Sequence, residues 1–297
     1  MTSAAPRISV LMTVYNGAAY LAQSIDSLLS QTFIDWELIL VENGSSDASP
    51  AIIERYHDTR IRRFEFSKNI GRTPALRYAF EQARGEYIAV LDADDIALPE
   101  RLAKQVAYLD AHQRVVLLGA WADFIDERGA KTGEWRPPTD SQQLIASLGS
   151  LNPIVHSSAM FRTAVAREVG GYPADVPYSQ DFALWLELAQ RGEFAMLSEC
   201  LCEFRIQSGS MSRAPVHRVE VTQDLLRMMI RAGQRLSLQG EGLRSNREEI
   251  AIARLRYATA LARSRKFGRA ASVIAGALLA DPLRLLNNRV TRAYLTR

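Results

Sequence analysis

The sequence predicts an α/β fold: a nucleotide-binding, mostly parallel sheet flanked by helices and followed by a C-terminal helical extension. Four short apolar runs alternate with helical patterns over the first third of the chain, which is typical of a parallel sheet with right-handed crossovers. Polar clusters follow three of these runs directly. Apolar residues make up 47% of the 297 residues and charged residues 23%, a composition that favours a packed core and excludes global disorder.

The first part of the chain contains the clearest elements. Buried strands are predicted at residues 8–12, 36–41 and 87–91, and a further strand at residues 61–66. Helices are predicted at residues 21–29, from the spacing of apolar side chains, and at residues 72–83, where Gly85 gives the stop signal. Ser46 is predicted to cap another helix with Asp47 in its first turn, and Pro99 to open a helix that reaches about residue 111.

The second part of the chain is less regular. The pattern weakens after about residue 115, and residues 135–180 are rich in Pro, Gly, Ser and Asn, which predicts a loop-heavy region able to shape an acceptor pocket. A short amphipathic helix is predicted at residues 181–190 and a strand at residues 200–204. From His217 onward the pattern is helical, with a helix pair predicted over residues 250–286.

The polar clusters occur where the predicted strands end. They are residues 13–16, 42–44 and 92–95. Ligands of open α/β sheets bind beyond the carboxyl ends of the strands, so we expect these three clusters to meet at one crevice.

The last of these clusters is acidic. Asp92, Asp94 and Asp95 repel one another unless a cation neutralises them, and a hard divalent ion, Mn²⁺ or Mg²⁺, suits carboxylate ligands and bridges substrate phosphates. The alternative is an acidic loop that caps the following helix. Capping needs one acid rather than three, which favours the metal site.

Four segments together resemble the successive motifs of the family 2 glycosyltransferases, which have the GT-A fold. They are residues 14–16, 41–47, 69–71 and 91–95. Order and spacing match over residues 7–112, and a weaker match extends to residue 212. Each motif is weak alone, but the set is specific.

The resemblance implies an inverting, metal-dependent transferase of the hexosyltransferase type. It would move a sugar from a nucleoside-diphosphate sugar, often UDP-linked, to an acceptor hydroxyl in bacterial cell-surface polysaccharide or glycan synthesis. The implied nucleotide contacts are Thr13, Tyr15, Glu42, Asn43, Asn69, Arg72 and Asp92. Asp94 would ligate the metal that bridges the diphosphate and stabilises charge on the leaving group.

One motif departs from the usual wording of the family. Asp-Asp-Gly-Ser is the common form, whereas this chain has Glu42-Asn43-Gly44-Ser45. Glu42 reaches one methylene further, and Asn43 adds a hydrogen-bond donor. With this departure the motif does not indicate which nucleobase the chain prefers, but it still predicts nucleotide binding.

An inverting transfer also needs a general base near the acceptor hydroxyl. The family places it in a Glu-Asp pair at the start of a short helix, and residues 179–185 resemble that segment, with Gln180 in place of Glu. Asp181 is therefore the candidate base. The alternative is that Asp181 only caps its helix.

Three further residues are candidates for contacts with the acceptor or the donor sugar. His156 lies in a loop similar to one beneath the family's active site, and it would contact a sugar or be structural. Trp185 would stack on a sugar or belong to the core. Arg205 would meet the diphosphate, in a loop that often carries His where this chain has Gln207.

The charge is unevenly distributed. Residues 213–297 contain 17 basic and 6 acidic residues, a net of +11, whereas residues 1–212 contain 19 and 27, a net of −8. We therefore divide the chain into a catalytic domain, residues 1–212, and a basic helical extension, residues 213–297. Within the first, residues 1–112 would bind the nucleotide sugar and residues 113–212 the acceptor.

The basic extension has two interpretations. Its helices would lie on anionic lipid and bring the enzyme to a lipid-linked acceptor, or they would pack on the catalytic domain. No recognised nucleic-acid motif is present. Cys200 and Cys202 are too close in sequence for a disulfide framework, and a strand-like run follows Arg7 at once, so we expect a cytoplasmic protein, with peripheral contact on the inner membrane face under the lipid interpretation.

Other classes fit less well. A sugar-1-phosphate nucleotidyltransferase would carry a Gly-rich loop with Arg and Lys after the first strand, where this chain has Tyr15-Asn16-Gly17-Ala18. A Rossmann dehydrogenase would carry Gly-x-Gly-x-x-Gly there. A non-catalytic binding protein with the same fold is disfavoured by Asp92, Asp94 and Asp181, although only turnover decides.

Overall fold

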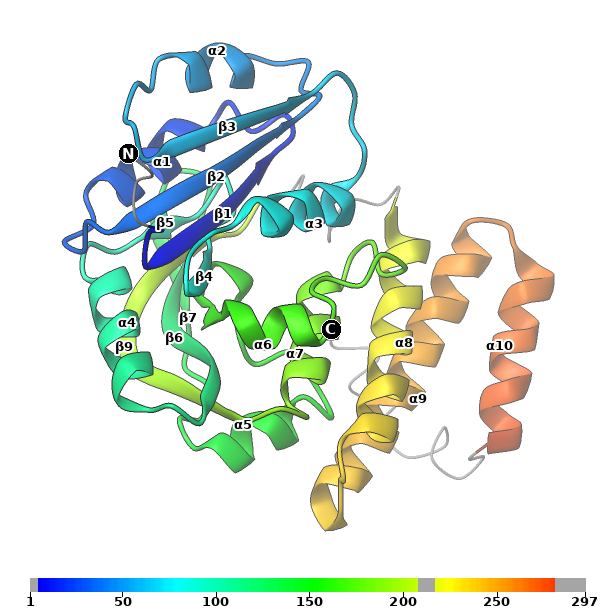
Figure 1. Ribbon diagram of the computed structural model, residues 1–297. Helices are drawn as coiled ribbons and strands as arrows, with labels where there is room; N and C mark the ends of the chain where they lie inside the picture. Colours follow the sequence, from blue (N-terminus) through cyan, green and yellow to red (C-terminus); the bar gives the residue numbers. More distant parts are fainter. Residues whose placement is uncertain (1–4, 208–216, 281–297) are drawn as a thin grey trace. The chain divides into compact units, whose positions relative to one another are not determined.

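The computed structural model describes residues 5–207 and 217–280. The chain divides into two compact units, Met1–Leu144 with Pro153–Gln207, and Ile145–Asn152 with Ser208–Arg297. The first unit contains a mixed sheet flanked by helices, and the second is helical (Figure 1).

The four predicted strands form the parallel part of the sheet, in the order β3-β2-β1-β4. Their bounds are β1 Ile8–Val14, β2 Trp36–Asn43, β3 Ile61–Phe66 and β4 Tyr87–Val90. Nearly all residues of β1, β2 and β4 are buried, as expected for central parallel strands covered on both faces. The predicted strand at residues 61–66 is confirmed as β3, which is an edge strand and is only half-buried.

Four helices accompany these strands: α1 Leu21–Leu29, α2 Ser49–Glu54, α3 Arg72–Gln82 and α4 Arg101–Ala111. In Figure 1, α3 lies against β1 and β2. The predicted cap of α2 is wrong: the helix begins at Ser49, and the Ser46 amide donates instead to Asn16 Oδ1. Likewise α4 begins at Arg101, two residues after Pro99.

The rest of the sheet was largely missed by the sequence analysis. It consists of β5 Ile96–Ala97, β6 Val115–Ile125, β7 Lys131–Trp135, β8 Met160–Arg162 and β9 Glu193–Arg205. The expected loss of regularity after residue 115 is therefore wrong for β6 and β7. Only the end of β9 was predicted, because the exposed Ser198 and Glu199 interrupt its apolar pattern.

Short elements fill the loop-heavy region: α5 Ser141–Ser147, the 3₁₀ turn η1 His156–Ser158 and α6 Thr163–Glu168. Helix α7, Gln180–Leu188, follows and is almost entirely buried. Because β8 pairs with β4 and with β6, it connects the parallel part of the sheet to the later strands. This pairing brings η1 beside the end of β4.

The second unit contains three helices that pack in chain order, α8 Arg218–Arg235, α9 Gly240–Arg263 and α10 Phe267–Ala280. Asn246 is buried where α9 meets α8, and its amide donates to the carbonyls of Met229 and Gly149. The predicted helix pair corresponds to α9 and α10, although residues 281–286 of that prediction lie outside the described residues. Among the described helices, none has the length and apolarity needed to cross a bilayer.

Candidate active site

The loops after β1 and β2 are tied together by hydrogen bonds. The Asn16 amide donates to Ser45 Oγ (3.0 Å), and Asn16 Oδ1 accepts from the Ser46 amide (2.8 Å). Asn16 has a φ of +52°, a conformation that Asn tolerates better than most residues. The Ala18 amide adds a bond to Asp47 Oδ2 (2.9 Å). The two strand ends therefore form one rim, and the sequence analysis predicted their proximity but none of these bonds.

Asn43 fixes the loop that leads into α3. Its Nδ2 donates to Asn69 Oδ1 (3.1 Å), and its Oδ1 accepts from the Ile70 amide (3.0 Å). Asn69 Oδ1 also accepts from the Gly71 amide (2.7 Å). An ionised Asp at position 43 has no proton to donate to Asn69. The Asn at position 43, where the family commonly has Asp, is therefore explained by the hydrogen bond that it donates to Asn69.

Glu42 holds the turn that follows it. Its carboxylate accepts from the amides of Gly44 (3.1 Å) and Ser45 (2.6 Å), and the side chain is buried. Gly44 has a φ of +72°, and a Cβ there would lie 2.3 Å from the carbonyl carbon of Lys68. The turn therefore requires glycine for its backbone angle and for its closeness to the next loop.

We expect Gly44→Ala to destabilise the protein more than Gly129→Ala. Both positions have positive φ, which costs Ala about 1–2 kcal/mol, but a Cβ at Gly129 meets nothing within 4 Å. The clash at Gly44 adds about 1–3 kcal/mol. Urea denaturation of both variants measures the difference, and equal losses of unfolding free energy would contradict the close approach of the two loops.

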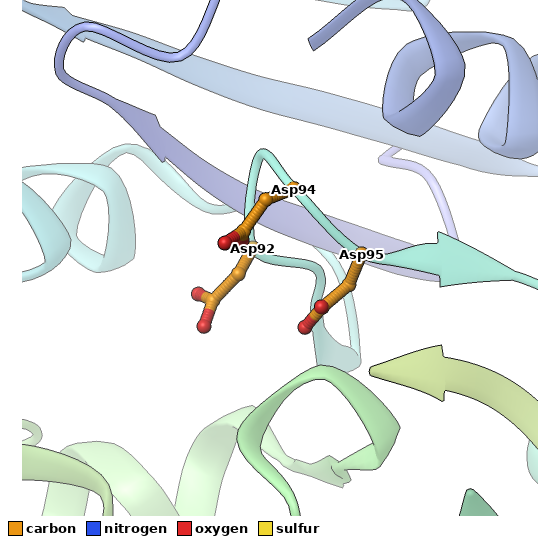
Figure 2. Close-up of side chains that lie close together, drawn as sticks. All are labelled: Asp92, Asp94 and Asp95. Atoms are coloured by element: carbon orange, nitrogen blue, oxygen red, sulfur yellow. The ribbon is translucent and has the colours of Figure 1, made fainter. Parts of the chain in front are cut away.

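Three carboxylates follow β4 on one loop. Oxygens of Asp92, Asp94 and Asp95 all lie within 4.8 Å of one another. Figure 2 shows the carboxylates of Asp92 and Asp94 on the same side of the loop. Carboxylate oxygens are ligands that Mn²⁺ and Mg²⁺ accept, so the donor set fits a hard divalent cation.

The three acids have different surroundings. Asp95 is fully buried and accepts from Ser157 Oγ and from the Arg205 amide (2.8 Å). Burial and the neighbouring carboxylates raise its pKa well above the usual range. Because both of its oxygens accept bonds from the protein, Asp95 anchors the acidic loop to η1 and to the end of β9.

Asp94 is only partly buried, and Gln207 Nε2 donates to its Oδ2 (2.5 Å). Burial and the like charge of Asp92 raise the pKa of Asp94. A divalent cation would relieve this repulsion, so Asp94 fits the role of metal ligand. Gln207 occupies the position where the sequence analysis noted a missing His, and its contact with Asp94 was not predicted.

Asp92 is paired with Arg72, the first residue of α3. Arg72 Nη2 donates to both carboxylate oxygens, at 2.8 and 2.6 Å. Burial alone would raise the pKa of Asp92, but Arg72 and His156 together outweigh it and hold the pKa well below its usual range. Arg72 Nε is also 3.1 Å from the side-chain oxygen of Gln180, once that amide is oriented so that its nitrogen donates to Tyr178 O.

Asp181 lies in the first turn of α7, directly after Gln180. Burial lowers the pKa of Arg72, but the charges of Asp92 and Asp181 outweigh it and raise that pKa above its usual value. The negative charge of Asp94 also raises the pKa of Arg72. Burial raises the pKa of Tyr172, and the charge of Asp181 raises it further. The structure therefore brings the candidate base and the acidic loop to the same guanidinium.

His156 and Trp185 are both buried behind the acidic loop. His156 Nε2 is 2.9 Å from Tyr172 Oη, and its Nδ1 is 3.7 Å from Asp92 Oδ1. Trp185 is 0% exposed and packs against Phe161 and His156. The burial of Trp185 favours the core alternative over sugar stacking.

Arg205 is buried and fully engaged with protein atoms. Its guanidinium donates to Asp94 O (2.9 Å), Asp126 O (3.0 Å) and Gln23 Oε1 (3.0 Å). It also lies 4.3 Å from the centre of the Tyr20 ring. This geometry favours a positioning role beneath the acidic loop over direct contact with a diphosphate.

Thr13 and Tyr15 mark the end of β1. Thr13 is half-buried, whereas Tyr15 is 48% exposed. An exposed aromatic ring at this rim offers a flat apolar surface to a base. Of the predicted nucleotide contacts, Tyr15 and Asn69 are the exposed ones.

Comparisons with known sequences point to one family. The sequence model described as Glycosyl transferase family 2 matches residues 9–170. The chain is 35% identical over 207 residues to an uncharacterized glycosyltransferase of Methanocaldococcus jannaschii, covering 68% of this chain and 71% of that protein. It is 31% identical over 229 residues to the O-antigen biosynthesis glycosyltransferase WbnJ of Escherichia coli, covering 75% and 89%.

Solved structures of similar fold contain bound nucleotide sugars. S. aureus TarS 1-349 in complex with UDP-GlcNAc matches with a TM-score of 0.65 at 19% identity, over 85% of this chain and 73% of that one. The mannosyltransferase PcManGT from Pyrobaculum calidifontis, in complex with GDP-Man and Mn²⁺, matches with a TM-score of 0.62 at 20% identity, over 99% and 84%. These matches confirm the predicted GT-A fold.

Proposed function

Because the chain belongs to glycosyl transferase family 2 and is a glycosyltransferase, we propose that it uses a UDP-sugar as donor and inverts the anomeric centre. The observation that carries the proposal is that Arg72 pairs with Asp92 of the acidic loop and also lies against Gln180, the residue before Asp181. Nucleotide binding, charge neutralisation and proton removal would then occur side by side.

In this proposal the rim of β1 and β2 binds the nucleotide. Tyr15 would face the base, with Thr13 and the carboxylate of Glu42 beside it. Asn43 and Asn69 would act mainly by holding their loop, because their amides already bond to each other. Asp92, oriented by Arg72, would accept a bond from a ribose hydroxyl.

Mn²⁺ or Mg²⁺ would be held by Asp94, close to Asp92, and would neutralise charge on the departing diphosphate. The protein's own contribution is to keep Asp94 in place through Gln207 and through the buried anchor Asp95. The complex of PcManGT with Mn²⁺ supports a metal of this class.

Asp181 would remove the proton from the acceptor hydroxyl. The E. coli protein named above for O-antigen biosynthesis supports a glycan or lipid-linked acceptor in surface polysaccharide synthesis. Residues 1–112 would bind the donor and residues 113–212 the acceptor, while residues 213–297 would form a separate basic extension.

The donor class can be tested by thermal unfolding with UDP, GDP, CDP and dTDP, each with and without Mn²⁺. A ligand at about 100 times its Kd stabilises the native state by about 2.7 kcal/mol, which corresponds to a rise in Tm of about 5–10 °C for a domain of this size. We expect the largest rise with UDP and Mn²⁺ together. A larger rise with another base would overturn the UDP assignment, and no rise with any base would overturn nucleotide binding.

A further inference from the structure

An apolar and basic surface lies on the second unit, apart from the residues discussed so far. It consists of residues 263–269, which are the turn between α9 and α10 with the helix ends on either side, and the exposed side of α10. Phe267 is 65% exposed, Ile274 41% and Leu278 45%. We call this set the α10 surface.

The exposure follows from how α10 packs. Ala270 and Ala277 are buried, and Ala270 joins the cluster that contains Tyr257 and Leu261 of α9. Phe267, Ile274 and Leu278 follow one another at intervals of seven and four residues, so they form a single stripe along the helix. Ala270 and Val273 therefore make contact with α9, while the larger side chains of Phe267, Ile274 and Leu278 face solvent.

Four cations lie within four residues of Phe267 in the sequence. Arg263, Arg265, Lys266 and Arg269 are all exposed, and Arg269 also donates to Tyr257 Oη (3.1 Å). No acidic residue occurs from position 250 to position 280. The α10 surface thus combines an apolar stripe with a concentrated positive charge at one end.

We propose that the α10 surface binds an anionic lipid membrane, with Phe267 and the apolar stripe entering the interface and the cations contacting lipid phosphates. Charge complementarity selects this occupant. A second copy of the chain would bring two cationic turns together, and the chain's own residues 281–297 carry four Arg and one Asp, which repel the turn as well. The phosphates of a nucleic acid would pair with the cations, but a nucleic acid offers no aliphatic surface that would cover the apolar stripe.

The test is flotation of the full chain with two kinds of vesicle, phosphatidylcholine alone and phosphatidylcholine with about one third phosphatidylglycerol, at low and high salt. We expect binding only to the anionic vesicles, weakened by salt. Phe267→Ser should lower the partition coefficient about tenfold. Each Lys or Arg near an anionic surface strengthens binding about fivefold, so Arg263→Glu with Lys266→Glu should lower it by about 25-fold or more.

Ile34→Ser and Arg128→Glu are matched controls, because Ile34 is 75% exposed and Arg128 is exposed, both in the first unit. Both should bind vesicles as the unmodified protein does. Equal binding by Phe267→Ser, or no binding to anionic vesicles at low salt, would overturn the proposal. So would a Phe267→Ser variant that changes the oligomeric state without lipid. Thermal shifts with UDP and Mn²⁺ should be unchanged in every variant, which separates this proposal from the proposed function.

Discussion

Replacing Asp181 with Asn is expected to lower the rate of sugar transfer by about 10²–10⁴-fold, the range that a general base contributes. The side chain keeps its size and loses its capacity to accept a proton. Donor binding should persist, because Arg72 remains paired with Asp92 through two hydrogen bonds. The rate is measured as UDP release from the UDP-sugar that stabilises the protein most, with and without added acceptor.

Glu187→Gln provides the control for this experiment. It makes the same change from acid to amide on the same helix, α7, six residues after Asp181. Its rate should match that of the unmodified protein. Full transfer by Asp181→Asn would refute the assignment of the base, and a loss of UDP binding equal to the loss of rate would place Asp181 in the donor site instead.

The parallel part of the sheet was predictable because its strands are apolar on both faces. Continuous runs such as residues 87–91 occur only where helices cover both sides of a strand, and turn residues end each of them. The later strands do not form continuous apolar runs of this kind. Strand β9 has exposed polar residues at its centre, and β8 is only three residues long, so neither forms a recognisable run.

The sequence predicted which residues of the candidate site follow the ends of strands. It did not predict which of their side chains contact one another. Spacing placed Asp92 and Asp94 beyond β4, but the pairing of Gln207 with Asp94 spans 113 residues of chain. The same limit applies to Asn43, whose role depends on a loop 26 residues away. Contacts between distant segments depend on packing, which periodicity does not encode.

Asp94→Ala is expected to abolish the metal-dependent part of donor binding while leaving the fold intact. Asp94 is partly exposed, and Gln207 donates to its carboxylate. The loop should keep its shape, because the fully buried Asp95 anchors it through Ser157 and the Arg205 amide. Tm without ligand should therefore stay close to that of the unmodified protein, whereas the rise with UDP and Mn²⁺ should fall to the level seen with UDP alone.

The matched control for this variant is Asp123→Ala, which removes a carboxylate paired with Arg136 and Lys131 outside the acidic loop. It should keep the full response to Mn²⁺.

Metal binding by the unmodified protein should also strengthen as pH rises, because a cation competes with protons for Asp94, whose pKa lies above its usual value. That pH dependence should vanish in Asp94→Ala. If this variant kept a Mn²⁺-dependent shift, Asp92 would hold the cation despite its pairing with Arg72, and the division of roles between the two acids would be wrong.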